Sequence, residues 1–169
     1  RVDLLRSYGL EPRNKILLIG PPGNGKTSLA EAIAEALMLP LYVVKYESLV
    51  GAYLGETASR LKKLIDYVST RNCVVFFDEC DTYETGEIKR VVSSLLLQID
   101  NLPSHVIVIG ATNHPELLDR AVWRRFQIKV TLPIPTRSNI IAWLEKFQHT
   151  HRIRFEYASE TIAKKLLGI

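Results

Sequence analysis

The chain has 169 residues, of which 47% are hydrophobic, so it is long enough for one well-buried domain and too short for two of ordinary size. Its 22 basic residues barely exceed its 18 acidic ones and do not cluster, which gives little support to a nucleic-acid-binding function. The longest apolar runs have the length of strands, so neither a transmembrane helix nor a signal peptide is predicted.

Strands and helices are predicted to alternate along the chain. Apolar, β-branched runs predict five strands, at 16–19, 41–44, 74–77, 106–109 and 128–132. Amphipathic or Ala-rich stretches predict helices at 26–38, 57–68, 87–99, 115–122 and 137–148. Because the strands are apolar at successive positions, we expect an α/β fold in which helices cover both faces of a parallel sheet, in three αβα layers. A ligand would then bind at the carboxyl ends of the strands.

Two prolines mark the end of this alternating region. Pro133 and Pro135 follow the last predicted strand, and the sequence after them is helical. The sequence therefore predicts a main domain over residues 1–135 and the beginning of a small helical unit over residues 136–169.

A glycine-rich loop joins the first strand to the first helix. Its sequence, "GPPGNGKT", fits the phosphate-binding pattern G-x-x-x-x-G-K-[ST] in the strand-loop-helix context that the pattern requires. Lys26 is expected to reach the β- and γ-phosphates and Thr27 to ligate Mg²⁺, whereas a simple glycine-rich turn is the plainer alternative. The expected phosphate-binding residues are Gly20, Pro21, Pro22, Gly23, Asn24, Gly25, Lys26, Thr27 and Ser28.

Polar residues end two later strands. Asp78 and Glu79 follow the strand at 74–77, where Asp78 would hold Mg²⁺ and Glu79 would activate water as a general base. Asn113 follows the run "VIVIGAT", and its amide could orient the attacking water. Without the glycine-rich loop, these residues would be read as solvated acids and a turn asparagine.

The cysteines and histidines suggest neither a disulfide nor a metal centre. Cys73 and Cys80 bracket a predicted strand and would lie about 23 Å apart, too far to pair. His149 and His151 lack zinc-ligand spacing. A reducing, cytoplasmic location fits this cysteine usage best.

Together, the motifs "GPPGNGKT", "VVFFDE", "GATN" and "LDRAVWRRF" resemble those of AAA+ ATPases, from about Ile16 to Phe147. The stretch 86–100 is similar to a helix found in the AAA family proper. The resemblance implies a P-loop NTPase fold, ATP and Mg²⁺ as ligands, ATP hydrolysis, and a small helical lid. It also implies self-assembly into a ring, a hexamer in the full-length protein.

Two further sites are implied by this resemblance. Tyr53, Leu54 and Gly55 occupy the place of a pore loop that grips a polypeptide, although Tyr53 on its own would be expected to pack against the core. Arg124 and Arg125 resemble the arginine fingers of spastin- and katanin-like members, which act in a neighbouring subunit; otherwise they would form a solvated face or a salt bridge. The resemblance does not decide which of the two is the finger.

Two departures from the family pattern stand out. Only "DTYET" separates the acidic motif from the following helix, a connection shorter than the family usually has at its second pore loop. Either this member trims that loop or residues are missing from the sequence near Thr82 and Tyr83. The chain stops at "LLGI", where lids of the family begin a Gly-x-Ser-x-Ala segment, so an incomplete lid is expected.

Three functions remain to be compared. The first is an ATP-driven ring motor that threads or remodels a polypeptide, which the Tyr53-Leu54-Gly55 triplet favours. The second is a nucleotide switch or loader acting on DNA or a protein complex, which the lack of a basic cluster disfavours. The third is a scaffold that binds ATP without hydrolysing it, which the presence of Lys26, Glu79 and Asn113 disfavours.

Overall fold

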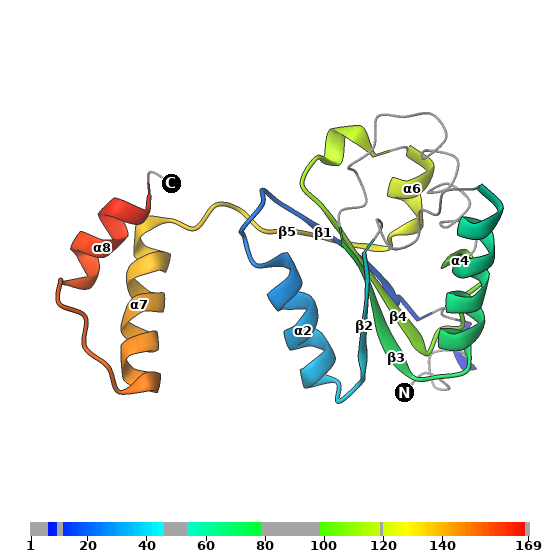
Figure 1. Ribbon diagram of the computed structural model, residues 1–169, viewed down its shortest axis with the longest axis horizontal. Coiled ribbons are helices and arrows are strands. Elements are labelled where there is room, and N and C mark those ends of the chain that lie inside the picture. The colour runs from blue at the N-terminus through cyan, green and yellow to red at the C-terminus, as the bar shows by residue number, and fades with distance from the viewer. Residues whose placement is uncertain (1–6, 10–11, 46–53, 79–98, 119, 168–169) are drawn as a thin grey trace. The chain divides into compact units, whose positions relative to one another are not determined.

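The computed structural model describes residues 7–9, 12–45, 54–78, 99–118 and 120–167 (Figure 1). Contacts within the chain define two units, Arg1–Leu132 and Pro133–Ile169. The first unit holds the sheet and the second a pair of helices. This division falls close to the boundary that the two prolines predict. In the described part of the chain, no helix combines the length and apolar character needed to cross a bilayer.

The first unit is built on a five-stranded parallel sheet, as the sequence predicts. The spatial order of the strands is β2-β3-β4-β1-β5. β4 therefore lies between β1 and β3, with Val108 opposite Lys15 on one side and Val106 opposite Cys73 on the other. The strands are β1 (Lys15–Ile19), β2 (Leu41–Lys45), β3 (Cys73–Asp78), β4 (Val106–Thr112) and β5 (Ile128–Thr131).

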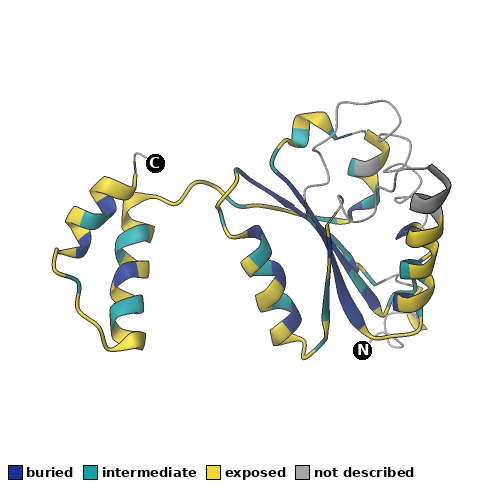
Figure 2. Ribbon diagram, in the orientation of Figure 1, coloured by how far each residue is buried: buried dark blue, intermediate teal, exposed yellow. Residues whose placement is uncertain are grey.

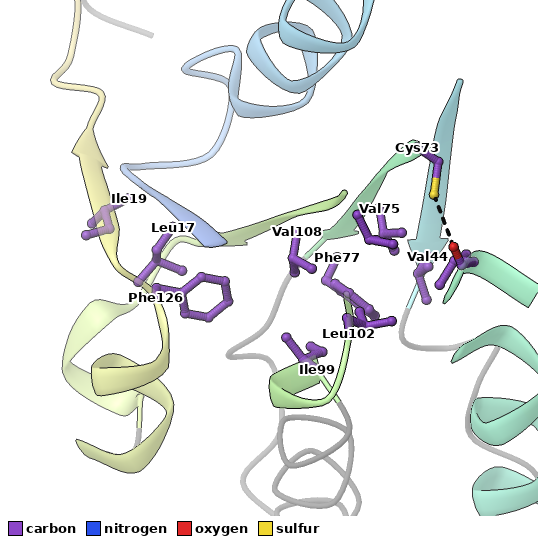
Figure 3. Packing of buried hydrophobic residues seen from close by; sticks show 12 residues of the cluster. Leu17, Ile19, Val44, Cys73, Val75, Phe77, Ile99, Leu102, Val108 and Phe126 are labelled. Atoms are coloured by element: carbon purple, nitrogen blue, oxygen red, sulfur yellow. Dashed lines mark hydrogen bonds between the residues drawn. The ribbon is translucent and has the colours of Figure 1, made fainter. Parts of the chain in front are cut away.

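Helices cover both faces of this sheet, which confirms the predicted three layers. Side chains at successive strand positions alternate between the faces, so Leu17 and Leu18 belong to different hydrophobic clusters. Leu18 packs with Ala30 and Ala34 of α2 (Lys26–Ala36). On the other face, Leu17 shares a cluster with Val68 of α4 (Leu54–Ser69) and with Phe126 (Figure 3). The central strands β1, β3 and β4 are largely buried, the edge strands β2 and β5 are mostly exposed or partly buried, and the outer sides of the helices are exposed (Figure 2).

Two predicted helices need separate comment. The one expected at 87–99 lies, except for its last residue, outside the described residues. The one expected at 115–122 is not a single helix: a 3₁₀ turn, η1 (Pro115–Leu117), is followed by the short helix α6 (Arg120–Arg125). Leu118 causes the break because its backbone is extended, with ψ 130°.

The second unit is a helical hairpin of α7 (Arg137–His151) and α8 (Ser159–Leu166). α7 begins at the N-cap Thr136, whose hydroxyl accepts a hydrogen bond from the Asn139 amide at 3.3 Å. Gln148 joins the hairpin, because its side chain donates to Ser159 Oγ at 3.2 Å and accepts from the Phe155 amide at 3.0 Å.

Candidate functional site

The loop that follows β1 is fixed to the end of β5. The Leu132 amide donates to Ile19 O at 2.7 Å, and Asn24 Nδ2 donates to Leu132 O at 2.9 Å. A Cβ at Gly20 would lie 2.4 Å from that same Leu132 oxygen. Gly20 is therefore required by the close approach of the neighbouring backbone, and Asn24 anchors the loop at its middle.

The loop then turns so that its backbone faces the start of α2. Gly23 and Gly25 have φ angles of 78° and 77°, in the left-handed region that favours glycine. Gly25 is the N-cap of α2 and supplies no side-chain cap, and the first turn carries no acidic residue. The first amides of α2 lack intrahelical acceptors, and the helix dipole places partial positive charge there. This geometry suits a phosphate group.

Lys26, the first residue of α2, places its ammonium group inside the loop. The residue is 8% exposed. Its Nζ donates to Gly20 O at 2.7 Å, to Pro21 O at 2.9 Å and to Asn113 Oδ1 at 2.5 Å. These three acceptors are neutral oxygens rather than carboxylates, so an anionic ligand can pair with the ammonium group.

Two other strands bring polar side chains to this loop. Asp78 is the last residue of β3, and Asn113 directly follows β4. Because β4 lies between β1 and β3, the carboxyl ends of all three strands meet at one edge of the sheet. A pocket of about 350 Å³ is found there, lined by Pro22, Gly23, Gly25, Lys26, Thr27, Ser28, Asp78 and Asn113.

The lining of this pocket suits Mg²⁺ that arrives with a phosphate ligand. The Thr27 hydroxyl and the Asp78 carboxylate are oxygen ligands of the kind that Mg²⁺ prefers, and both line the pocket. Mg²⁺ in phosphate-transfer sites is commonly held by one or two carboxylates plus the phosphates and water. Among the described residues, no group of three or more His, Cys, Asp or Glu side chains could form a separate metal centre.

Other residues singled out from the sequence either fall outside the described residues or do not line this pocket. Tyr53 and Glu79 are outside the described residues, while Leu54 and Gly55 form the start of α4. Arg124 and Arg125 are the last two residues of α6.

The opposite end of β1 holds polar residues that sequence reasoning missed. Asn14 is 8% exposed, and its Nδ2 donates to Val106 O at 2.7 Å and to Pro103 O at 3.4 Å. Its backbone amide donates to Gln127 Oε1 at 3.0 Å, and its carbonyl accepts from the Val108 amide at 2.8 Å. An asparagine before a strand is usually a turn residue. No feature of the sequence therefore distinguishes the buried, strand-anchoring Asn14 from an ordinary turn asparagine.

An ion-pair network also lies at this end. Asp100 accepts from Lys15 Nζ at 3.1 Å and from Arg125 Nε at 2.5 Å. Partial burial of the Asp100 carboxyl acts to raise its pKa, but the hydrogen bonds from Arg125 and Lys15 outweigh that effect and lower the pKa below its ordinary value.

Known proteins similar to this chain include bacterial, archaeal and yeast proteins. The "Uncharacterized AAA family ATPase y4kL" of Sinorhizobium fredii is 46% identical over 75% of this chain and 41% of that protein. The "Putative 26S proteasome regulatory subunit homolog" of Methanothermobacter thermautotrophicus is 35% identical over 90% of this chain and 44% of that protein. The "Peroxisomal ATPase pex6" of Schizosaccharomyces pombe is 40% identical over 77% of this chain.

The chain spans less than half the length of these three relatives, and only 15% of the yeast protein. Residues 16–134 match the sequence profile of the "ATPase family associated with various cellular activities (AAA)". The matched range contains the phosphate loop, the whole sheet except Lys15, and α6. The chain therefore belongs to the AAA family of ATPases.

Proposed function

We propose that this chain is the Mg²⁺-dependent, ATP-hydrolysing part of a homo-oligomeric ring that threads or remodels polypeptides. The convergence of the glycine-rich loop, Asp78 and Asn113 on one pocket carries the nucleotide-binding part of this proposal. The pocket places a buried cation, the amino end of a helix and a carboxylate around a space of about 350 Å³, which suits the phosphates of ATP.

Each pocket residue takes a distinct role in this proposal. Lys26 stabilises negative charge on the β- and γ-phosphates. Thr27 and Asp78 hold Mg²⁺, which neutralises charge on the phosphates when it is bound. Asn113 lines the pocket beside Lys26, and its amide orients the attacking water. Glu79 follows Asp78 directly in sequence and acts as general base for that water.

The position of α6 supports arginines that act in a neighbouring subunit rather than in their own pocket. The amide of Gln127, two residues beyond Arg125, donates to Lys15 O at the amino end of β1. The phosphate loop follows the carboxyl end of β1, and a five-residue strand is about 13 Å long. The end of α6 and the loop are therefore linked to opposite ends of one strand, which supports arginines that act in a neighbouring subunit.

The substrate part of the proposal rests on similarity and on the predicted pore loop. One relative is named as homologous to a regulatory subunit of the proteasome, which favours a polypeptide substrate here as well. We assign its binding to Tyr53, Leu54 and Gly55, of which Leu54 and Gly55 begin α4 and Tyr53 lies outside the described residues. The hexameric state, the lid role of residues 136–169, the spastin- and katanin-like arginine region and the cytoplasmic location stay predictions.

The rate of ATP hydrolysis by the full-length protein tests this function. We expect Mg²⁺-dependent hydrolysis that rises when an unfolded polypeptide is added and does not rise with double-stranded DNA. Tyr53→Ala should lower the polypeptide-stimulated rate far more than the unstimulated rate, because it removes the aromatic contact to the substrate. Stimulation by DNA alone would instead favour the loader alternative.

A further inference from the structure

The excess positive charge of the chain belongs to its second unit. Residues 133–169 carry six lysines and arginines against three glutamates, a net charge of +3, whereas the whole chain carries only +4. These basic residues form no long run in the sequence, so the fold decides which of them lie together. The helical hairpin of α7 and α8 therefore attracts acidic groups more than the first unit does (Figure 1).

A cleft of about 660 Å³ is found in this hairpin, where α7 ends and the chain turns toward α8. Ligand sites in proteins commonly have volumes of roughly 300–1,000 Å³. The residues that α7 contributes are three or four positions apart, so they lie on one side of the helix. The cleft is lined by Glu145, Gln148 and His149 of α7 and by Arg152, Ile153 and Arg154 of the segment that follows.

The two arginines of this cleft have no role in holding the hairpin together. Both are exposed, and within the residues that the structure describes neither guanidinium makes a hydrogen bond, ion pair or ring contact. Glu145 also lines the cleft, but it pairs with neither Arg152 nor Arg154. Each guanidinium is therefore available for charge-assisted hydrogen bonds with a carboxylate.

The backbone that carries these arginines is fixed in an unfavourable conformation. Arg152 has φ 53°, in the left-handed region that costs a residue with a side chain more than it costs glycine. Gln148 holds the segment, because its carbonyl accepts from the Ile153 amide at 3.2 Å and its Oε1 accepts from the Phe155 amide at 3.0 Å. The chain is thus tied on both sides of Arg154. Strained residues of this kind often belong to functional sites.

We propose that this cleft binds an acidic peptide segment of a partner protein. Arg152 and Arg154 pair with carboxylates of the peptide, and Ile153, which is 43% exposed, contacts an apolar side chain between them. Glu145 disfavours a phosphate or a nucleic acid, because its carboxylate would repel phosphate oxygens, whereas it can accept hydrogen bonds from peptide amides. The cleft shares no lining residue with the ATP pocket, so binding requires neither ATP nor the pore loop.

Fluorescence anisotropy with the full-length protein tests this site. The probe is a fluorescein-labelled peptide made of glutamates around two leucines, and the control peptide has lysines in place of the glutamates. Both are added to the Tyr53→Ala variant, so that the proposed pore loop does not contribute. We expect saturable binding of the acidic peptide alone, equal with and without ATP and weaker at high salt. Absence of such binding would overturn the proposal and leave the proposed ATPase function untouched.

Substitutions in the same background then locate the binding. Arg152→Gly and Arg154→Gln should each weaken binding of the acidic peptide at least about tenfold, since each removes charge-assisted hydrogen bonds. Arg152→Gly should also raise the thermal unfolding midpoint, because glycine accepts the positive φ, which separates lost binding from lost folding. Lys146→Ala combined with Lys164→Ala removes two exposed charges outside the cleft lining and should change the affinity less than about twofold.

Two outcomes of these measurements would contradict the site. Equal weakening by the lysine pair and by the arginine variants would show that only the overall charge of the hairpin attracts the peptide. Displacement of the bound peptide by oligothymidine or inorganic pyrophosphate, at concentrations similar to that of the peptide, would show a phosphate-binding cleft instead.

Discussion

The two ends of β1 carry polar residues that are used in different ways. At the amino end, the amides of Asn14 and Lys15 both donate to the Gln127 side chain, and Asn14 also donates to Val106 of β4. Asp100 pairs there with Lys15 and Arg125. At the carboxyl end, Lys26 contacts loop carbonyls and Asn113, but a pocket of about 350 Å³ stays open beside it.

This difference shows how one strand serves two purposes. Between its ends, β1 is an apolar element with Leu17 and Leu18 fully buried on opposite faces. It therefore acts as a rigid spacer of about 13 Å. Polar groups that satisfy each other at the amino end stabilise the fold, whereas polar groups around a hollow at the carboxyl end can still bind a ligand.

The largest expected effect belongs to the carboxyl end. Lys26→Ala should weaken ATP binding at least about 100-fold, or about 2.7 kcal/mol, because it removes the buried cation that faces the phosphates. The dissociation constant for ATP, from titration calorimetry, measures this loss. Lys63→Ala, an exposed lysine of α4, is the control and should bind normally. Unchanged affinity of Lys26→Ala would remove this residue from the site.

The next effect belongs to the amino end. Asn14→Ala should lower the free energy of unfolding by about 2 kcal/mol, because it leaves the buried Val106 carbonyl without its donor. Urea denaturation measures this change. Asn101→Ala, at an exposed turn position, should cost close to nothing. Equal costs for the two variants would show that Asn14 does not anchor the strand.

Two glycines of the phosphate loop, at the carboxyl end of β1, should differ in how much stability is lost when each is replaced by alanine. Gly20→Ala places a Cβ 2.4 Å from Leu132 O and should cost about 2 kcal/mol of stability, since backbone must move. Gly23→Ala meets no atom within 4 Å and pays only for its positive φ, about 1 kcal/mol. Urea denaturation should show a larger loss of stability for Gly20→Ala than for Gly23→Ala. The reverse order would contradict the close contact between the phosphate loop and the end of β5.

The smallest effect is a pH dependence at the amino end. The lowered pKa of Asp100 means that its ionised form stabilises the fold at pH values above the ordinary Asp pKa, about 3.9. That contribution is lost as the pH falls through the lowered pKa. Asp100→Asn should therefore be less stable than the wild type at neutral pH, and the difference should shrink in acid. A difference that grows in acid would contradict the ion-pair network.

The fold and the pocket lining follow from local sequence patterns. The apolar runs predict all five strands, and the glycine-rich loop predicts the turn into α2. Each of these signals is contained within a few neighbouring residues, so it can be read without knowing the fold. The order of the strands does not follow, since it depends on which of five similar apolar runs pair. Contacts such as Asn24 to Leu132, 108 residues apart, require that order first.

The same reason explains what sequence reasoning missed at the amino end. Lys15 and Asp100 are 85 residues apart, and each looks like an ordinary surface charge. The adjacent arginines 124 and 125 carry one chemical signal, and only the position of Asp100 distinguishes them. Predictions from the sequence are therefore strongest where a motif contains its own partners and weakest where partners come from distant segments.

Thermal unfolding with and without Mg²⁺ and ATP tests most directly whether the two ends of β1 have separate roles. Binding to the folded state alone stabilises it, so at about 100 times the dissociation constant the wild type should gain roughly 5–10 °C in its unfolding midpoint. Lys26→Ala should unfold close to the wild-type temperature without ATP, because removing a buried charge offsets the loss of its hydrogen bonds, and should gain nothing when ATP is added. Asn14→Ala should start several degrees lower and gain as much as the wild type. If either variant changes both the unfolding midpoint without ATP and the ATP-induced gain, the two ends of β1 do not have separate roles.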